Sequence, residues 1–93
     1  MVKKVMYYIL TYDLTSPKRL PKLLKLCRKY LNWVQNSTFE GELNGSQIME
    51  LKAGIKGIID KKEDSVFIYA IRTDTVVKKE ILGIEKNEIT FFV

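Results

Sequence analysis

Residues Val5 to Asp13 read VMYYILTYD, eight uncharged residues that end in a single carboxylate. The run is rich in β-branched and aromatic side chains, which predicts a buried strand over Val5–Tyr12. Both faces of this strand are apolar, and that favours a central place in a sheet. A turn sequence containing Ser16 and Pro17 follows at once. Asp13 is therefore expected at the C-terminal end of the strand.

The positive charge of the chain is concentrated directly after this strand. Residues 14–39 carry six basic and no acidic side chains, whereas the other 67 residues carry ten basic and eleven acidic ones. The net charge of +5 is typical of proteins with an anionic partner, most often nucleic acid. A lone carboxylate beside a basic segment is the main electrostatic feature of the sequence.

A helix is predicted after the turn, from Pro21 to about Leu31. The proline disfavours a regular helix in the turn before it, so an irregular first turn is expected over Lys18–Leu20. The apolar positions at helical spacing are Leu20, Leu23, Leu24, Cys27 and Leu31. The opposite face carries Lys18, Lys22, Lys25 and Lys29. Composition alone leaves two interpretations of these lysines open, a solvated face and a set of phosphate contacts.

The middle of the chain predicts one more strand and a second helix. Trp33–Leu43 has the composition of a half-exposed edge strand, in which Gly41 marks a bulge or a close approach of another backbone. Asn44 and Gln47 fit a capping box at the start of a helix, whose apolar stripe is Ile48, Leu51, Ile55, Ile58 and Ile59. Gly54 and Gly57 indicate either close packing against a sheet or simple tolerance. Residues 60–64 then predict a solvated turn.

The last third of the chain predicts further strands. Ser65–Arg72 is apolar on both faces, so we expect it to be central in the sheet. Val76–Glu85 predicts a weaker strand and Glu88–Val93 a short one, which pairing with another subunit would protect from aggregation. The order βαββαβ, plus one or two strands, predicts a ferredoxin-like α+β sandwich with an antiparallel sheet and one domain, residues 1–93.

Composition excludes several kinds of chemistry. The chain has no histidine, and no GxGxxG or Walker glycine loop occurs in it. Carboxylates and hydroxyls remain, which favour a hard cation as cofactor. Asp13 is the candidate ligand, although an aspartate between a strand and a Ser-Pro turn is also typical of a turn or cap residue. Tyr12 and Trp33 lie at strand ends, where they are candidates to stack on bases.

Two further features bear on where the protein acts. No apolar run approaches the roughly 20 residues needed to span a bilayer, so no membrane partner is expected. The single cysteine, Cys27, has no partner for an internal disulfide and falls on the apolar helix face, which predicts a small core residue. A reducing compartment agrees with this usage, and we expect a cytoplasmic protein.

Two blocks of sequence together resemble a known family. The predicted first strand ends in a Tyr-Asp pair, and residues 34–43 read VQNSTFEGEL. This combination is similar to the pattern of the small CRISPR-associated Cas-two family, over almost the whole chain. The resemblance implies a ferredoxin-like homodimer in which a C-terminal strand of each subunit joins the sheet of the other. It also implies a metal-dependent endonuclease that cuts single-stranded RNA or double-stranded DNA and acts in spacer acquisition with the Cas-one integrase.

The same resemblance assigns roles to residues. It makes Asp13 the metal ligand, for Mg²⁺ or another divalent cation, with two Asp13 side chains brought together by the dimer axis. It matches Tyr12, Ser37 and Phe39 to positions implicated around the site. The predicted nucleic-acid contacts are Lys18, Arg19, Lys22, Lys25, Lys29 and Trp33. An alternative function is a non-catalytic architectural subunit that binds duplex DNA and the integrase, and a third is a toxin-like ribonuclease of related fold.

Overall fold

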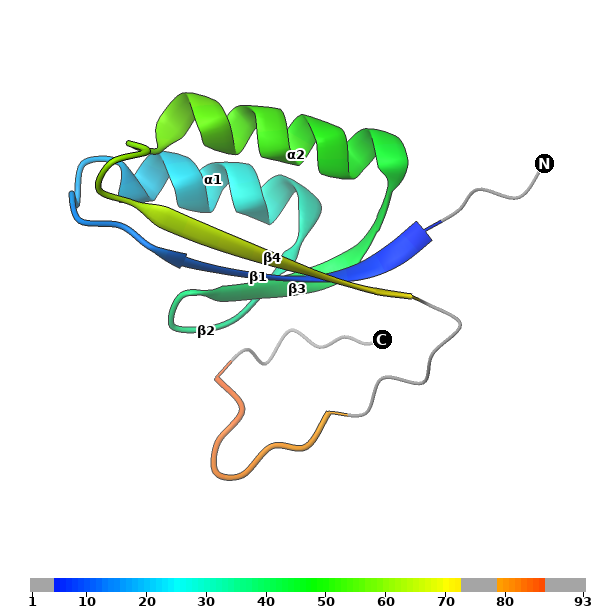
Figure 1. Cartoon of the computed structure of the whole chain (residues 1–93). Helices are drawn as coiled ribbons and strands as arrows, with labels where there is room; N and C mark the ends of the chain where they lie inside the picture. Colours follow the sequence, from blue (N-terminus) through cyan, green and yellow to red (C-terminus); the bar gives the residue numbers. More distant parts are fainter. Residues whose placement is uncertain (1–4, 73–78, 87–93) are drawn as a thin grey trace.

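Two layers, a four-stranded sheet and a pair of helices, make up the structure (Figure 1). This computed structural model describes residues 5–72 and 79–86. In chain order the elements are β1 (Val5–Asp13), α1 (Leu20–Tyr30), β2 (Asn32–Gln35), β3 (Thr38–Asn44), α2 (Gly45–Ile58) and β4 (Ser65–Arg72). The sheet has the order β2-β3-β1-β4 with antiparallel neighbours. The predicted α+β fold with the order βαββαβ is confirmed.

Strand β1 is the centre of the sheet, as predicted. It pairs with β3 from Val5 opposite Asn44 to Thr11 opposite Thr38, and with β4 as far as Asp13 opposite Ser65. Every second β1 side chain faces the helices, and Leu10 is fully buried among them. The two-sided pairing fixes the position of the strand to its last residue.

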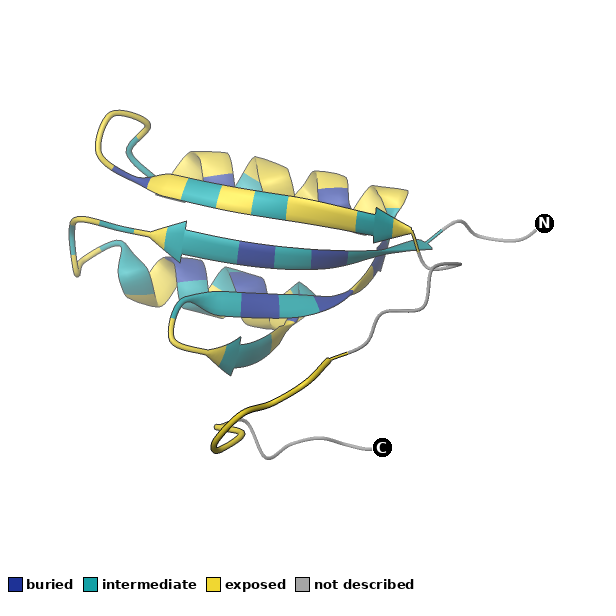
Figure 2. Cartoon of the chain, turned by 60° about the horizontal axis from the view of Figure 1, so that its bottom comes forward, coloured by how far each residue is buried: buried dark blue, intermediate teal, exposed yellow. Residues whose placement is uncertain are grey.

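The prediction that Ser65–Arg72 is a central strand is wrong for the described residues, although its bounds are confirmed. Strand β4 lies at the end of the sheet order and pairs with β1 alone. Figure 2 shows mostly exposed and intermediate residues along β4, whereas β1 and β3 carry buried ones. Phe67 and Tyr69 are 58% and 53% exposed. One face of β4 packs toward the helices, and no helix covers the other, although both faces carry apolar side chains.

The segment Trp33–Leu43 is a hairpin of two strands, where one edge strand was predicted. Asn36, in the turn, has a φ of 45°, a conformation that asparagine tolerates better than most residues. The edge strand is β2, and β3 is internal. The bulge lies in β2 between Trp33 and Gln35. Gly41 does not make the predicted close approach to another backbone: a Cβ there would lie 3.3 Å from the side chain of Leu31 and 3.7 Å, an ordinary contact distance, from its Cα.

Both helices form close to where the sequence places them. Helix α1 follows turns at residues 17–19, and its end is marked by a hydrogen bond from Leu31 N to the Cys27 carbonyl (2.8 Å). The capping box of α2 is complete: Gln47 N donates to Asn44 Oδ1, and Asn44 N donates to Gln47 Oε1, both at 2.9 Å. The core between the layers contains Tyr8, Leu10, Leu23, Cys27, Leu31, Phe39, Leu43, Ile48, Leu51 and Ile55.

Three other predictions have different outcomes. Residues 60–64 are not simply a solvated turn, since the Asp64 side chain is completely buried. The described part of the predicted strand Val76–Glu85, residues 79–85, contains no strand. The predicted strand Glu88–Val93 lies outside the described residues.

Gly54 in α2 provides a test of helix packing. A Cβ at Gly54 would lie 2.7 Å from Leu26 Cδ2 of α1, whereas one at Gly57 would meet nothing within 4 Å. The close contact of Gly54 is therefore with the other helix, where contact with the sheet was one prediction. Gly57→Ala should raise the free energy of unfolding by up to about 1 kcal/mol, the usual helix-propensity gain. The free energy of unfolding of Gly54→Ala should be about 1–3 kcal/mol lower than that of Gly57→Ala, because Leu26 must move. Urea unfolding measures both, and equal gains would contradict this packing.

Candidate functional site

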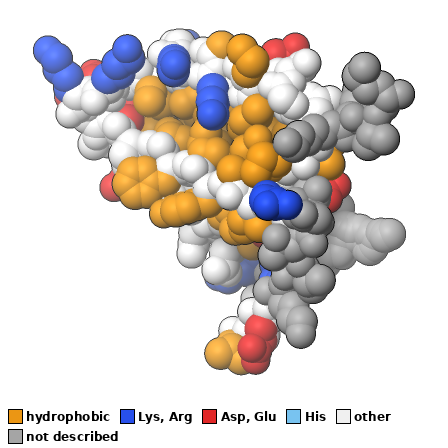
Figure 3. Space-filling model, turned by 45° about the vertical axis from the view of Figure 1, so that its right-hand side comes forward, with side chains coloured by type: hydrophobic (Ala, Val, Ile, Leu, Met, Phe, Trp, Pro, Cys, Tyr) orange, Lys and Arg blue, Asp and Glu red, His pale blue; other side chains and the backbone are white. Residues whose placement is uncertain are grey.

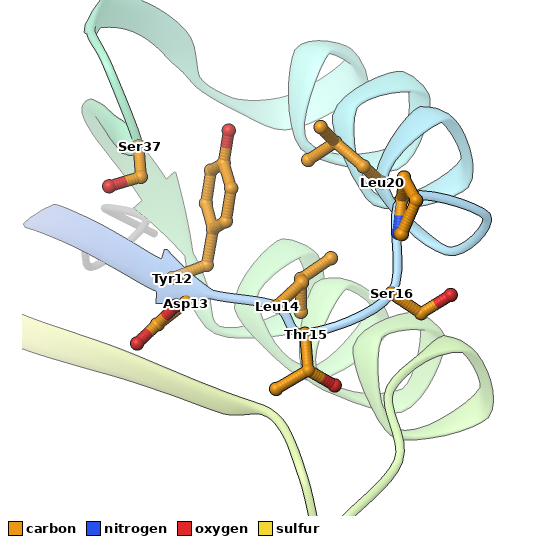
Figure 4. Close-up of a pocket in the computed structure, with 8 residues that line it drawn as sticks. Tyr12, Asp13, Leu14, Thr15, Ser16, Leu20 and Ser37 are labelled. Carbon is orange, nitrogen blue, oxygen red and sulfur yellow. The ribbon is translucent and has the colours of Figure 1, made fainter.

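Asp13 lies at the C-terminal end of β1 and is exposed. Its backbone is opposite Ser65, the first residue of β4, so the sheet fixes the strand on which this carboxylate stands. Figure 4 shows the Asp13 and Tyr12 side chains leaving β1 on opposite sides. Asp13 consequently belongs to the sheet face that the helices leave uncovered, whereas the Tyr12 ring points toward the helix layer.

Tyr12 and Ser37 meet through a backbone contact between distant parts of the chain. Tyr12 N donates to the Ser37 carbonyl at 3.1 Å, which joins the hairpin turn to the end of β1. The Tyr12 ring packs at a tilt on Phe39, with 6.4 Å between the ring centroids. Burial raises the pKa of the Tyr12 hydroxyl. Tyr12 is thus a neutral hydroxyl near neutral pH, able to donate a hydrogen bond.

Phe39 lies beneath this arrangement and does not reach the surface. Its side chain is fully buried, so it supports the Tyr12 ring from below and touches no substrate. The family resemblance grouped Phe39 with Tyr12, Ser37 and Asp13, and the structure brings all four to the same end of the sheet.

A pocket of about 350 Å³ opens at this end of the sheet (Figure 4). It is lined by Tyr12, Asp13, Leu14, Thr15, Ser16, Pro17, Leu20 and Ser37. Its polar side chains are one carboxylate and four hydroxyls, and its floor is apolar. Three of the four residues that the sequence assigned to the catalytic site line this single pocket.

The donor set of the pocket is the kind that a hard cation accepts. Every polar side chain in the lining ends in oxygen, and Mg²⁺ is commonly held by one or two carboxylates together with water and substrate phosphates. Within residues 5–72 and 79–86, no group of three or more acidic or cysteine side chains could hold a metal by itself. One Asp13 per chain fits a metal that substrate or a second copy helps to hold.

The lysines of α1 form an exposed basic face. Lys22, Lys25 and Lys29 recur on the helix at spacings of three and four residues, and Lys18 precedes it. All four side chains are exposed. They lie within the segment that lacks any acidic residue up to Glu40. This surface is an electrostatic match for a phosphate backbone.

Arg19 differs from these lysines because it is held by acidic side chains. Its Nε donates to Asp64 Oδ2 at 2.7 Å, and its Nη2 donates to Asp64 Oδ1 at 3.1 Å and to Glu63 Oε1 at 3.3 Å. The two-pronged contact with Arg19 holds the pKa of the Asp64 carboxyl well below its usual range. The structure therefore gives Arg19 an internal partner, in contrast to the predicted phosphate contact.

Sequence reasoning missed Asp64 altogether. It stands in the acidic and basic run of residues 60–64, which looks like an ordinary solvated turn. No local pattern distinguishes it from Asp60 or Glu63, because its partners Arg19 and Thr15 are 45 and 49 residues away in the chain. The available signal was Arg19, one of two arginines in the basic segment, since arginine is favoured for paired contacts with carboxylates.

Trp33 is turned to the hairpin in this structure. Its indole Nε1 donates to the Asn36 carbonyl at 3.1 Å, and the half-buried ring packs against the core. It therefore stabilises the turn that brings Ser37 to Tyr12. Its predicted stacking on bases stays a prediction.

In the part of the chain that the structure describes, no helix is long and apolar enough to cross a membrane.

Comparisons with known proteins identify the family. The sequence pattern of the family described as CRISPR associated protein Cas2 matches residues 6–79. A relative from Thermotoga maritima, named CRISPR-associated endoribonuclease Cas2, is 48% identical over 86 residues, covering 92% of this chain and 98% of its own. A relative of the same name from Methanocaldococcus jannaschii is 49% identical over 84 residues, 90% of this chain and 73% of its own.

Solved structures agree with the sequence relatives. A crystal structure of a Cas2 protein superposes with a TM-score of 0.77 at 34% identity, covering 96% of this chain and 99% of the other. Streptococcus pyogenes Cas2 superposes with a TM-score of 0.69 at 32% identity, covering 84% of this chain and all of the other. The family pattern, the sequence relatives and the solved structures all point to one family. This chain belongs to the CRISPR-associated Cas2 family.

Proposed function

We propose that this protein is a metal-dependent endoribonuclease that hydrolyses phosphodiester bonds at the Asp13 pocket. The observation that carries the proposal is the exposed Asp13 carboxylate at the end of β1, in a pocket whose other polar side chains are hydroxyls. The relatives named endoribonuclease support the reaction class. Duplex DNA as a second substrate, and action in spacer acquisition with the Cas-one integrase, extend the proposal on the basis of family membership.

In this proposal, different residues would bind the metal, orient the phosphate and hold the nucleic-acid backbone. Asp13 would hold a divalent cation, Mg²⁺ or a similar ion, which lowers the pKa of bound water and offsets charge on the phosphate. Tyr12 and Ser37 would orient the phosphate from the other side of the strand end by hydrogen bonding. The exposed lysines of α1 would hold the backbone of the nucleic acid, because phosphate contacts position a strand without reading its sequence.

Asp13→Asn tests the catalytic role directly. The amide keeps the shape of the side chain but loses the negative charge that a cation needs, so cleavage of labelled single-stranded RNA in Mg²⁺ should fall to background. Glu50→Gln, at an exposed carboxylate of α2, serves as the matched control and should cut like the wild type. Equal cutting by wild type and Asp13→Asn, or cutting that survives chelation of the metal, would sink the metal-ligand assignment.

A non-catalytic architectural role is the second candidate function, and the exposed lysine face favours it equally. An architectural subunit needs the basic surface and tolerates loss of the Asp13 charge. Measuring duplex DNA binding and spacer capture by Asp13→Asn separates the two candidate functions. If the protein is an architectural subunit, this variant should retain both. Loss of both functions with Asp13→Asn would contradict the architectural candidate.

The lysine face is tested by the salt dependence of RNA binding, measured in chelator to prevent cleavage. Each phosphate contact on a single strand contributes about 0.7 to the slope of log affinity against log salt. Lys22→Gln with Lys25→Gln should therefore flatten the slope by about 1.4. Lys52→Gln with Lys56→Gln on α2, also exposed, makes the same change in net charge and should leave the slope nearly unchanged. An equal effect of both pairs would rule out a specific α1 face.

We further propose that the protein acts as a homodimer, as the family resemblance implies. The sheet face that the helices leave uncovered supports this. Phe67 and Tyr69, two residues apart on β4, both lie on that face and are both more than half exposed. Figure 3 shows further hydrophobic side chains gathered in the centre of one side of the molecule, with basic and acidic side chains around them. Exposed apolar patches of this kind mark interaction sites. A dimer would also bring a second Asp13 to share a metal.

Sedimentation equilibrium should give a mass twice that of the 10.9 kDa chain. Phe67→Ser with Tyr69→Ser should shift the equilibrium toward monomer, since burial of these rings would drive association. Met49→Ser is the control, because Met49 is 71% exposed on α2, on the other side of the molecule from the uncovered sheet face. A monomeric wild type, or a dimer insensitive to the β4 pair, would contradict this arrangement.

A further inference from the structure

A buried carboxylate joins the two loops that flank the Asp13 strand end. Both oxygens of Asp64 are occupied: Oδ1 accepts from Thr15 N at 3.0 Å and from Arg19 Nη2 at 3.1 Å. Oδ2 accepts from Arg19 Nε at 2.7 Å and from Asp60 N at 2.8 Å. The Asp64 side chain is 0% exposed. A charge this deeply buried persists only when its partners are held in good geometry.

One partner of Asp64 lines the candidate site and a second is next to it in the chain. Thr15 lines the pocket two residues after Asp13, and Arg19 immediately precedes α1, which contributes Leu20 to the same wall. Ser65, the residue after Asp64, pairs with Asp13 itself. The Asp64 carboxylate thus fixes the β1–α1 loop through Thr15 and Arg19. Its neighbour Ser65 fixes the end of β1 through the pairing with Asp13.

Glu63 makes a weaker and more peripheral version of the same contact. Its Oε1 accepts from Thr15 Oγ1 at 3.0 Å and from Arg19 Nη2 at 3.3 Å. The Glu63 side chain is 57% exposed, whereas that of Asp64 is fully buried. Exposed ion pairs contribute little to stability or geometry, so the two adjacent carboxylates differ mainly in burial and in the number of bonds they accept.

We propose that Asp64 is a positioning residue for the Asp13 site, acting through Thr15 and Arg19 without touching substrate. The inference rests on the proposed nuclease function. The carboxylate holds the β1–α1 loop in the conformation that shapes the pocket beside Asp13. Arg19 belongs to this internal support because its guanidinium forks across both Asp64 oxygens. Catalysis requires this geometry because small displacements of positioned groups have large effects on rate.

Asp64→Asn is the main test. An amide offers one acceptor oxygen where the carboxylate offers two, so either Thr15 N and Arg19 Nη2 or Arg19 Nε and Asp60 N lose their acceptor. The kcat for RNA cleavage should fall about 10- to 100-fold, the usual effect of removing such a supporting group, while KM stays within about twofold. Hydrogen exchange should accelerate at the Thr15 amide or at the Asp60 amide, because one of the two loses its acceptor whichever carboxylate oxygen the amide nitrogen replaces. Thermal unfolding and circular dichroism check that the variant is folded at the assay temperature.

Two further variants keep the inference falsifiable. Glu63→Gln, at the exposed neighbour, should retain nearly wild-type kcat and Thr15 protection. Arg19→Lys keeps the charge but loses the fork, and it should lower kcat without raising KM even if Asp64→Asn does not fold. A rise in KM at constant kcat in Arg19→Lys would overturn the inference, since Arg19 would then bind substrate.

The inference and the proposed function fail in different ways. Wild-type kcat in Asp64→Asn, or an equal loss in Glu63→Gln, overturns the positioning role while leaving a metal-dependent nuclease intact. If Asp13→Asn cuts as well as wild type, the proposed function falls, and Asp64 then has no catalytic site to position. Unchanged exchange at both the Thr15 and the Asp60 amides in a folded Asp64→Asn overturns the loop contact by itself, whatever the activity.

Discussion

The hydrogen bonding of β1 to strands on both sides is the constraint on which the rest of the structure depends. Pairing with β4 continues to Asp13, the last residue of the strand. On the other side, the ladder with β3 reaches Thr11, and the bond from Tyr12 N to the Ser37 carbonyl extends it. The strand end is therefore held by two neighbours that come from distant parts of the chain. An exposed carboxylate can then stand at a defined place without being buried.

The same strand separates two chemical surroundings. Side chains that alternate along β1 point either into the core, where Tyr12 rests on Phe39, or onto the uncovered sheet face, where Asp13 ends the row. One strand end thus presents a charged group on one side and a hydroxyl of raised pKa on the other. The loop that follows must turn sharply toward α1, and Asp64 holds that turn from beneath.

Much of this arrangement follows from local sequence. The apolar run of β1, the Asn44 capping box and the spacing of the α1 lysines are short-range patterns, and the structure has each element where the pattern places it. The Asn36-Ser37 turn was not predicted, because the pair lacks the glycine that marks most two-residue hairpin loops. The Asp13, Tyr12 and Ser37 grouping came from resemblance to a family.

Long-range contacts account for what the sequence did not predict. The role of Asp64 depends on residues 45 and 49 positions away, and hydropathy in a turn says nothing about them. The edge position of Ser65–Arg72 was missed because an apolar alternation does not reveal which face a helix covers. The exposed Phe67 and Tyr69 of that strand look like core residues until the helices are placed.

The central claim is that Asp13 holds a divalent cation, and binding of Mn²⁺ to isotope-labelled protein in the presence of single-stranded RNA tests it most directly. Mn²⁺ takes the same oxygen ligands as Mg²⁺ and broadens NMR signals of nearby amides. Selective broadening of the signals of Tyr12, Asp13 and Leu14, lost in Asp13→Asn, is the predicted result. Broadening centred on Asp60 and Glu63, or none at the end of β1, would contradict the account.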